Sequence, residues 1–285
     1  MTIDWEQADR LIDLALEEDL GGGDITTNWT VGSDAVAGAE LVAREGGLVA
    51  GTEVAERVFQ KVDPGIEFLV KKGDGSTVSP GDCVGVANGP ARGILTAERT
   101  VLNFMKRMSG IATTTSHYVD AVRETGAVIL DTRKTLPGHR TLDKYAVTVG
   151  GGRNHRTGLY DMVLLKENHI MAADGIGPAV YAVKAAMARE GTRVKIEVEV
   201  EDLRELDDAL AAGVDFILLD NMSPDDMREA VAAAGKLGEG RPKLEASGNV
   251  TLDTVRSVAE TGVDLISVGA LTHSVKALDL SLLFT

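Results

Sequence analysis

The pattern of apolar and polar positions in the first third of the chain predicts one helix followed by a strand-rich region. Apolar residues over residues 4–20 recur at the period of an amphipathic helix, and the three glycines at 21–23 end it. From residue 25 to about residue 93, glycine-rich turns separate short apolar runs at 39–43, 66–70 and 83–86, which predicts strands. Helices are expected near residues 54–61, 97–108 and 113–124.

From residue 127 the pattern changes to an alternation of strands and helices. Apolar runs predict strands at residues 128–130, 162–165, 194–200, 216–219, around Leu244 and at 265–268. The helices between them have recognisable starts at Gly177-Pro178, at the capping residue Ser223 and at Thr251. This alternation indicates an α/β fold with a parallel sheet, either open or closed as a barrel.

Polar or glycine-containing clusters follow nearly every predicted strand of this second part. In a barrel, the C-terminal ends of all strands converge on one mouth, whereas in an open sheet they spread along an edge. The clusters therefore favour a barrel. Six strands are clear, which is fewer than eight, so the barrel is expected to be incomplete.

The charge distribution isolates one segment. Residues 131–169 hold seven Lys/Arg and four Asp/Glu, a net charge of +3, within a chain whose net charge is −15. Cations that gather against the prevailing charge suggest a site for an anionic small molecule, although a solvated basic loop would have the same composition.

Composition excludes several classes of protein. The net charge of −15 argues against a nucleic-acid partner, which requires a broad basic face. No apolar run approaches the length that crosses a membrane, and no secretion signal is recognised. Cys83 is the only cysteine, so no intrachain disulfide and no cysteine-based zinc site is possible. A cytoplasmic location is expected.

Carboxylates at the ends of two predicted strands are candidates for metal or sugar binding. The period of a strand places Glu197, Glu199 and Glu201 on one face, where burial is costly unless the carboxylates meet cations or a metal. Glu199 could bind Mg²⁺ or a sugar hydroxyl, or form a salt bridge to the basic segment. Asp220 follows a wholly apolar strand, and carboxylates on separate strands suit Mg²⁺ held together with a substrate phosphate.

Anion-binding groups are expected in two forms. Ser247-Gly248-Asn249 and Gly269-Ala270 precede helix starts, where exposed backbone N–H groups can cradle a phosphate, although glycine is common in such loops. Guanidinium groups can clamp carboxylates, and the candidates are Arg133, Arg153 and Arg156, with His155 beside them.

Lys166 at a strand end has two chemical interpretations. It could contact phosphate or carboxylate, or it could be a desolvated Schiff-base lysine as in barrel aldolases. Composition does not decide between them.

Taken together, ten segments resemble the quinolinate phosphoribosyltransferase family, also called nicotinate-nucleotide pyrophosphorylase (carboxylating), within the type II phosphoribosyltransferases. They occur in the family's order and span almost the whole chain: residues 18–20, 23–27, 96–100, 109–113, 131–138, 151–158, 166–169, 197–199, 218–221 and 267–274. His139 is a departure, because the family more often has an aliphatic residue after this Pro-Gly pair.

The resemblance implies a glycosyltransferase that joins quinolinate to phosphoribosyl pyrophosphate (PRPP), releases CO₂ and pyrophosphate, and yields nicotinate mononucleotide for NAD synthesis. It also implies Mg²⁺ as cofactor and a homodimer whose active site is shared between subunits, possibly in a higher oligomer. The implied fold is an N-terminal α/β sandwich over residues 1–112, joined by the tail 274–285, and an incomplete barrel over residues 113–273 that carries the active site.

The resemblance also assigns roles to residues. Lys166, Glu199 and Asp220 would be catalytic, and Glu199 and Asp220 would hold Mg²⁺ directly or through water. Quinolinate would be bound by Arg99 from the partner subunit, Arg133, His155, Arg156 and Lys166. PRPP would be surrounded by Thr132, Lys134, Glu199, Asp220, Ser247, Gly248, Asn249, Val268, Gly269, Ala270 and His273.

Three alternatives remain at this level. A related type II phosphoribosyltransferase would take nicotinate or another heterocycle, but the density of arginines favours a substrate with two carboxylates. A Schiff-base aldolase would use Lys166. A binding module without enzymatic activity would hold PRPP without turnover.

Overall fold

The computed structural model describes residues 2–285, and the chain separates into two compact units. The first unit contains the residues up to Ser116 together with residues 135–151 and 271–285, and the second contains residues 117–134 and 152–270. The sequence-based division at residues 112 and 273 assigns residues 135–151 to the barrel, whereas here they pack within the first unit. The tail 274–285 lies in the first unit.

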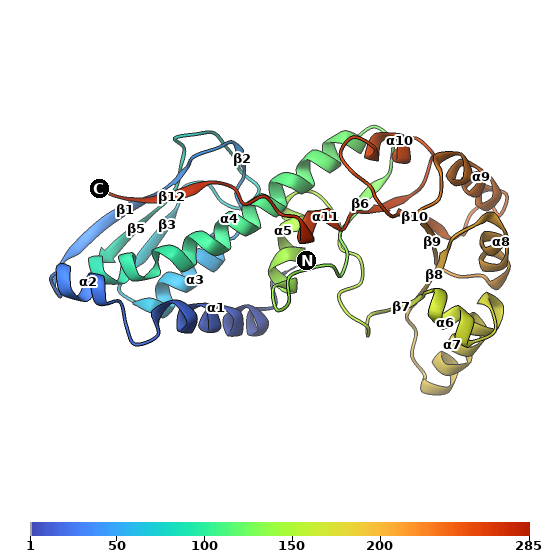
Figure 1. Cartoon of the computed structure of the whole chain (residues 1–285), viewed down its shortest axis with the longest axis horizontal. Coiled ribbons are helices and arrows are strands. Elements are labelled where there is room, and N and C mark those ends of the chain that lie inside the picture. The colour runs from blue at the N-terminus through green and yellow to red at the C-terminus, as the bar shows by residue number, and fades with distance from the viewer. Residues whose placement is uncertain (1) are drawn as a thin grey trace. The chain divides into compact units, whose positions relative to one another are not determined.

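The first unit is built around an antiparallel sheet (Figure 1). Its strand order is β12-β1-β5-β3, which brings the C-terminal strand alongside the first one. Strands β2 and β4 form a separate two-stranded antiparallel sheet. The bounds are β1 Val36–Ala43, β2 Gly47–Leu48, β3 Glu67–Val70, β4 Thr77–Val78, β5 Cys83–Pro90 and β12 Leu280–Phe284.

The helices of the first unit follow from local capping and amphipathic spacing. In α1 (Trp5–Leu20) the Asp4 carboxylate accepts the N–H of Gln7, and the helix buries Ala8, Ile12 and Leu16. The other helices are α3 (Thr52–Val62) and α5 (Arg140–Val149), with α2 and α4 described below.

Two expectations about this part of the chain were wrong. Strands were expected from residue 25, but residues Ile25–Thr30 form helix α2, because the Asp24 side chain accepts the N–H of Thr27 and caps a helix. Two helices were expected with a break between residues 108 and 113, but α4 runs unbroken over Ala91–Val122. Gly110 does not interrupt it; an added Cβ there would lie 2.2 Å from the Lys276 carbonyl oxygen, so glycine permits a close approach of the backbone.

The second unit is a six-stranded parallel sheet with helices along its outer side (Figure 1). The strand order is β6-β11-β10-β9-β8-β7, so β6 and β7 are edge strands and the barrel is incomplete, as predicted. The strands are β6 Val128–Leu130, β7 Met162–Leu165, β8 Lys195–Val200, β9 Phe216–Asp220, β10 Lys243–Ser247 and β11 Leu265–Ser267. The helices are α6 Glu167–Ala172, α7 Ile176–Glu190, α8 Leu203–Ala212, α9 Pro224–Gly235 and α10 Val255–Ala259, and the short α11 Ala270–His273 follows β11.

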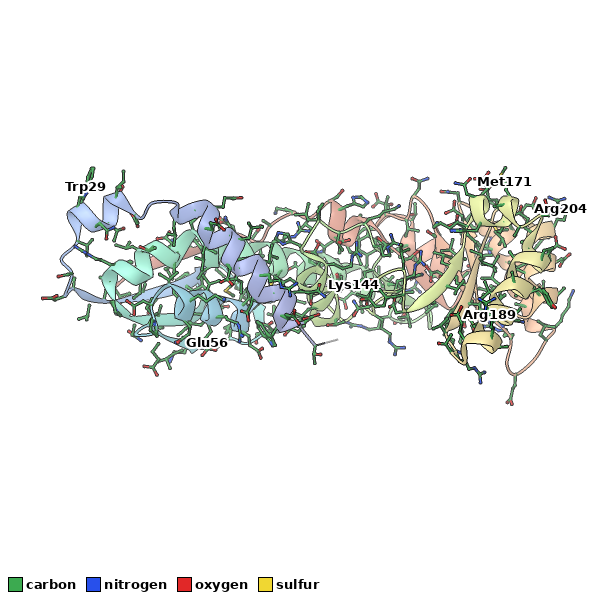
Figure 2. All side chains as sticks on the ribbon, turned by 90° about the horizontal axis from the view of Figure 1, so that it is seen from below. Trp29, Glu56, Lys144, Met171, Arg189 and Arg204 are labelled. Carbon is green, nitrogen blue, oxygen red and sulfur yellow. The ribbon has the colours of Figure 1, made fainter. Side chains whose placement is uncertain are left out.

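Burial mostly separates apolar core residues from polar surface residues, but several charged side chains are buried. Among the side chains marked in Figure 2, Trp29 on α2 and Met171 on α6 are exposed. Lys144 on α5 is instead fully buried, which is rare for lysine. Among the helices of residues 2–285, none is both long and apolar enough to span a membrane.

Candidate active site

A pocket of about 590 Å³ opens at the C-terminal ends of the parallel strands, and all of its lining residues belong to the second unit. Every strand of the sheet contributes to it, either through its own last residues or through the loop that follows. The predicted barrel mouth is therefore a real cavity, and such mouths are the usual place for ligands in barrel folds.

Four cations line the pocket: Arg133, Lys134, Arg156 and Lys166. Burial, and then the charge of neighbouring Arg133, lower the pKa of the Arg156 guanidinium. Two guanidinium groups held close together in a partly buried site repel each other, and an anionic ligand would remove that cost. Four cations of the basic segment thus line a pocket and do not belong to a merely solvated loop. Arg153 is exposed and does not line the pocket.

Lys166 and Glu199 form an ion pair across the pocket. The Lys166 side chain is 48% exposed, and that of Glu199 is 14% exposed. The expected salt bridge between Glu199 and the basic segment is present, and Glu199 also lines the pocket. Binding of Mg²⁺ or of a sugar hydroxyl by Glu199 stays a prediction. A Schiff-base lysine needs a desolvated amine, whereas this ammonium group is paired and half-exposed, so the geometry argues against an aldolase.

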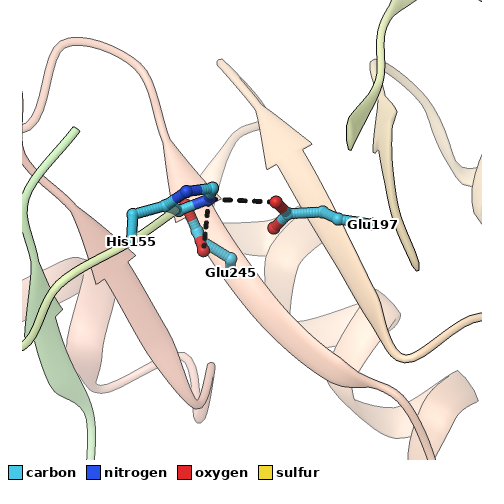
Figure 3. A group of neighbouring side chains, drawn as sticks. All are labelled: His155, Glu197 and Glu245. Carbon is cyan, nitrogen blue, oxygen red and sulfur yellow. Dashed lines mark ion pairs between the residues drawn. The ribbon is translucent and has the colours of Figure 1, made fainter. Parts of the chain in front are cut away.

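His155 is held in one orientation by its neighbours. Its backbone N–H donates to Asp131 Oδ1 at 2.9 Å, and the backbone N–H of Arg156 donates to His155 Nδ1 at 2.7 Å. Because Nδ1 accepts a hydrogen bond, the ring proton is on Nε2. Nε2 lies 2.9 Å from Glu197 Oε2 and 3.5 Å from Glu245 Oε2 (Figure 3).

Glu197 and Glu245 form a buried pair beneath this histidine. Glu197 is 0% exposed and Glu245 is 1% exposed, and Glu245 also lines the pocket. Burial, followed by the charge of Glu197, raises the pKa of Glu245 well above its usual value. The Oε1 atoms of both glutamates have no hydrogen-bond partner among the described residues. Burial of two neighbouring carboxyl groups therefore favours the neutral form of Glu245.

The same three side chains are close enough to suggest a metal site. Their ligand atoms lie within 4.8 Å of one another. A metal at Nε2 would require the proton to leave that nitrogen, but Nδ1 already accepts the Arg156 N–H, so both nitrogens would be deprotonated. A protonated carboxyl pair explains the geometry without that cost.

The loop after β10 is shaped to approach a ligand with its backbone. Gly248 has φ +101°, and an added Cβ would lie 2.1 Å from Asn221 Oδ1. Asn249 Nδ2 donates to this same Oδ1 at 3.1 Å, and the Asn221 N–H donates to the Ser247 carbonyl oxygen at 2.9 Å. Asn221 and Asn249 both have positive φ, at 53° and 51°. Backbone strain of this kind concentrates at ligand-binding loops.

The predicted site residues divide by position. The pocket is lined by Thr132, Arg133, Lys134, His155, Arg156, Lys166, Glu199, Asp220, Ser247, Gly248 and Asn249. Val268, Gly269, Ala270, His273 and Arg99 are not among its lining residues in the part of the chain described. Arg99 and His273 are exposed residues of the first unit. The roles of all these residues stay predictions.

Among the residues of this site that the sequence-based assignment of roles does not include, Glu197, Glu245 and Asn221 matter most for its geometry. Glu245 lies next to an apolar run and has no partner visible in the sequence. The sequence predicts that Glu197 lies on one face of its strand with Glu199, but its contact with His155 joins residues far apart in the chain. Asn221 was recognised only as part of a polar cluster.

A larger hollow of about 670 Å³ lies on the first unit, but its two cations are already paired. Arg57 pairs with Asp9 at 2.6 Å and stacks over the Trp5 ring at 4.8 Å, while Lys61 pairs with Asp13 at 2.6 Å. It is an ordinary surface groove without the converging polar groups of a ligand site.

Comparison with known families accounts for nearly the whole chain. Residues 111–283 match the model of the quinolinate phosphoribosyl transferase C-terminal domain, and residues 24–109 match that of the N-terminal domain. The chain belongs to the quinolinate phosphoribosyltransferase family. Its two matched segments lie in the order expected for the family.

Relatives of this family share the sequence over its full extent. The chloroplastic nicotinate-nucleotide pyrophosphorylase [carboxylating] of Oryza sativa is 47% identical over 284 residues, 95% of this chain and 76% of the relative. The probable enzyme of that name from Bacillus subtilis is 42% identical over 97% of this chain and 93% of its own. The structure of the Francisella tularensis nicotinate-nucleotide pyrophosphorylase superposes with a TM-score of 0.91 at 39% identity, covering 100% and 98% of the two chains.

Proposed function

We propose that this enzyme transfers the phosphoribosyl group of PRPP to quinolinate with decarboxylation, giving nicotinate mononucleotide, CO₂ and pyrophosphate for NAD biosynthesis. Membership of the quinolinate phosphoribosyltransferase family supports this activity. The observation that carries the proposal is a single pocket lined by four cations beside a glycine loop that admits no Cβ. Such a pocket suits a doubly anionic pyridine together with a phosphorylated ribose.

The residues divide naturally between the two substrates. Arg133, Arg156 and Lys166 face the carboxylates of quinolinate, and bidentate guanidinium contacts give them direction. Thr132, Lys134 and the loop Ser247–Asn249 suit the phosphates of PRPP. His155 contributes its ring to the pocket wall, because both of its nitrogens are engaged elsewhere.

The reaction requires stabilisation of positive charge at the anomeric carbon as pyrophosphate leaves. Glu199 and Asp220 supply negative charge to the same pocket from adjacent strands, β8 and β9. The pyridine nitrogen then attacks that carbon, and the ring nitrogen becomes cationic. Positioning and electrostatics provide the acceleration, so no covalent enzyme intermediate is needed.

Mg²⁺ fits Glu199 and Asp220 as the implied cofactor. Both side chains present hard carboxylate oxygens to the pocket, and Mg²⁺ is commonly held by one or two carboxylates together with substrate phosphates. The ion would neutralise the pyrophosphate as it departs. One side of Glu199 is occupied by Lys166, which leaves the other for the ion or for its bound water.

We further propose a homodimer with shared active sites. Arg99 is an exposed residue of α4. Family resemblance assigns Arg99 to quinolinate binding from the partner subunit, which requires a dimer. Larger assemblies are compatible with this arrangement. No nucleic acid or membrane partner is proposed, in keeping with the net charge of −15.

A cytoplasmic location is part of the proposal. Its support is the presence of a single cysteine, Cys83, in keeping with a reducing compartment. The rice relative is named as chloroplastic. Fractionation of the source cells with detection of the protein tests this point.

The decisive experiment is an assay of purified protein with PRPP, Mg²⁺ and quinolinate, in which both CO₂ and nicotinate mononucleotide are measured. Both products should appear in equal amounts, and chelation of Mg²⁺ should abolish them. Nicotinate serves as the comparison substrate: faster turnover of nicotinate, without CO₂, would favour the monocarboxylate alternative. Absence of nucleotide from either substrate would reject the proposal.

A further inference from the structure

The proposed reaction consumes a proton, and the residue roles given so far include no proton donor. The inference about this donor rests on the proposed function. When the bond between ring carbon 2 and its carboxylate breaks, CO₂ leaves and the electron pair stays on the ring carbon beside the cationic nitrogen. A new C–H bond must then form with that electron pair. The proton has to come from a group at the pocket or from water.

Three carboxyl groups line the pocket, and they differ in environment. Glu199 is paired with Lys166, and Asp220 stands near the rim, where it accepts from Asn221 Nδ2 at 2.9 Å. Glu245 is 1% exposed and lies in the most buried part of the lining. Glu245, whose pKa is raised by burial, is therefore also the carboxyl group of the lining that is most sheltered from water.

The surroundings of Glu245 suit a proton donor that is recharged after each cycle. Its Oε1 has no hydrogen-bond partner among the described residues, so this oxygen is not engaged by another group of the described chain. Its Oε2 lies 3.5 Å from His155 Nε2, which carries a hydrogen and can stabilise the charge that appears when the proton leaves. Glu197 Oε2 lies 2.9 Å from the same nitrogen.

We propose that Glu245 is the acid that protonates the pyridine carbon vacated by the departing carboxylate. The O–H bond of Glu245 breaks and its proton joins the electron pair on the ring carbon. Glu245 is left as a carboxylate beside Glu197. The repulsion between these two buried charges then favours uptake of a proton from solvent once the product has left.

Other proton carriers in the pocket fit this step less well. The Lys166 ammonium is paired with Glu199 on a half-exposed side chain, and its charge is needed for anionic substrates. The ring of His155 cannot give up its Nε2 proton without becoming an anion, because Nδ1 is already deprotonated.

Rapid-quench measurement of single turnovers tests the proposal with the variant Glu245→Gln. Glutamine preserves the shape of the side chain but has no acidic proton. Pyrophosphate release and quinolinate affinity should stay close to wild type, while formation of nicotinate mononucleotide falls by about 10²-fold or more, the usual contribution of a positioned acid. Without the acid the electron pair recaptures CO₂, so a nucleotide that retains both carboxyl groups should accumulate. Glu229→Gln is the matched control, because Glu229 is an exposed residue of α9. It should leave the rates of pyrophosphate release and of nicotinate mononucleotide formation unchanged.

Two results would overturn the assignment. One is wild-type formation of nicotinate mononucleotide by the glutamine variant. The other is an equal fall in pyrophosphate release and nucleotide formation together with weakened quinolinate binding, which is what a merely structural role of Glu245 would produce.

An infrared measurement on the wild-type enzyme keeps the inference testable if the variant does not fold. A protonated carboxyl C=O band should be present at neutral pH and should shift when quinolinate binds; its absence would reject a stored proton. This measurement does not depend on turnover. If the wild-type protein made no nucleotide, the proposed function would fail by itself, while the band would still report whether a proton is held.

Discussion

Among single residues, Arg156 offers the clearest separation of the two proposed substrates. Its guanidinium is partly buried, next to Arg133, and its Nη1 donates only a long bond of 3.3 Å to the Met162 carbonyl oxygen. Arg156→Ala should weaken quinolinate binding by about 1.5–3 kcal/mol, the range for a lost charged hydrogen bond. PRPP affinity should be unchanged, and calorimetric titration with each substrate measures both.

Arg153→Ala is the control for this comparison, because Arg153 belongs to the same basic segment but is exposed and outside the pocket. An equal loss of quinolinate affinity in both variants would show that the overall charge of the segment matters and that Arg156 makes no specific contact.

A methyl group at Gly248 should impair the binding of phosphate by the loop Ser247–Asn249. The added Cβ of Gly248→Ala would lie 2.1 Å from Asn221 Oδ1 and 3.1 Å from the Asn221 backbone nitrogen. The side chain of Asn221 must move and release its bond to Asn249. PRPP affinity should fall about tenfold or more, equivalent to one charge-assisted hydrogen bond of about 1.5 kcal/mol.

Gly240→Ala separates the steric effect from the backbone effect. Gly240 has φ +91°, close to the φ of Gly248, but an added Cβ has nothing within 4 Å. Both variants should lose about 1–3 kcal/mol of stability from the strained backbone, measured by urea unfolding. If Gly240→Ala also lowered PRPP affinity, the steric explanation would be wrong.

The sequence identified the charges of the site better than it identified their partners. Lys166 and Asp220 could be recognised because each follows an apolar run in a barrel pattern, and Arg156 because it is a guanidinium in the basic segment. The pairing of Glu197 with Glu245 could not, since it depends on the stagger of β8 against β10, two strands that are separated by β9. Hydrophobic periodicity fixes the face of a strand but not its shear.

At the level of elements, the unbroken course of α4 depends on Gly110. Alanine is the better helix former, yet its Cβ would meet the Lys276 carbonyl oxygen at 2.2 Å and the Ala277 Cα at 3.1 Å. Gly110→Ala should therefore lose about 1–3 kcal/mol of stability through overpacking. Thermal unfolding measures the change.

Gly235→Ala in α9 is the matched substitution, because no atom lies within 4 Å of the added Cβ and its φ is ordinary. It should gain about 0.4–1 kcal/mol of stability, since alanine restricts the unfolded chain. Stabilisation by both substitutions would mean that the close approach at Gly110 is easily relieved.

Asp264 joins the start of β10 to the loop before β11. Its carboxylate accepts from Arg241 at 2.7 and 3.0 Å, from Lys243 Nζ at 2.8 Å and from the Leu244 N–H at 2.9 Å. Burial alone would raise the pKa of Asp264, but the hydrogen bonds from Arg241 and Lys243 outweigh it and lower the pKa below its usual value.

This lowered pKa gives Asp264→Asn a defined pH dependence. The folded-state pKa lies below the unfolded one, so the contribution of Asp264 is fully present above the unfolded pKa and is lost as pH falls through the folded pKa. At neutral pH the variant should be less stable by about 1.5–3 kcal/mol, the range for a hydrogen bond to a charged group. The difference in the free energy of unfolding between variant and wild type should disappear in acid. Urea unfolding at a series of pH values measures this difference.

The comparison substitution is Asp207→Asn on exposed α8. Its free energy of unfolding, compared with wild type, should not change with pH in this way. If the difference between Asp264→Asn and wild type stayed constant into strong acid, the charge of Asp264 would not contribute to folding stability.

Element prediction succeeded where periodicity and capping agreed and failed where tertiary contacts decided. The six parallel strands and the helix capped by Ser223 were predicted. Helix α5 was not, because it lies in the basic segment that was interpreted only for its charge. The glycines of α4 suggested a break because close backbone packing cannot be seen in one segment alone.

For the whole molecule, the main prediction concerns active sites shared between subunits. Arg99→Ala and Lys166→Ala should each be inactive alone, because each removes a cation that the reaction needs. When the two are mixed and allowed to exchange, activity should return to at most about a quarter of wild type, since half of the random dimers are mixed and each has one intact site of two. The nucleotide assay measures this recovery.

Subunit exchange needs independent proof, which co-purification of two differently tagged variants provides. If the tags co-purified and activity did not return, Arg99 would have to act within its own chain or not at all.

The first unit combines segments that are far apart in the sequence, and this affects how it forms during synthesis. Residues 280–284 form β12, which pairs with β1 at residues 39–43. During synthesis on a ribosome, the antiparallel sheet therefore cannot be completed until β12 is made, and Phe284 follows its partner Ala39 by 245 positions. Every strand of the parallel sheet precedes β12 in the chain. The first unit, whose synthesis begins first, is therefore completed last. Until β12 is made, the edge of β1 is open to unwanted pairing, which a chaperone that shields nascent strands would prevent.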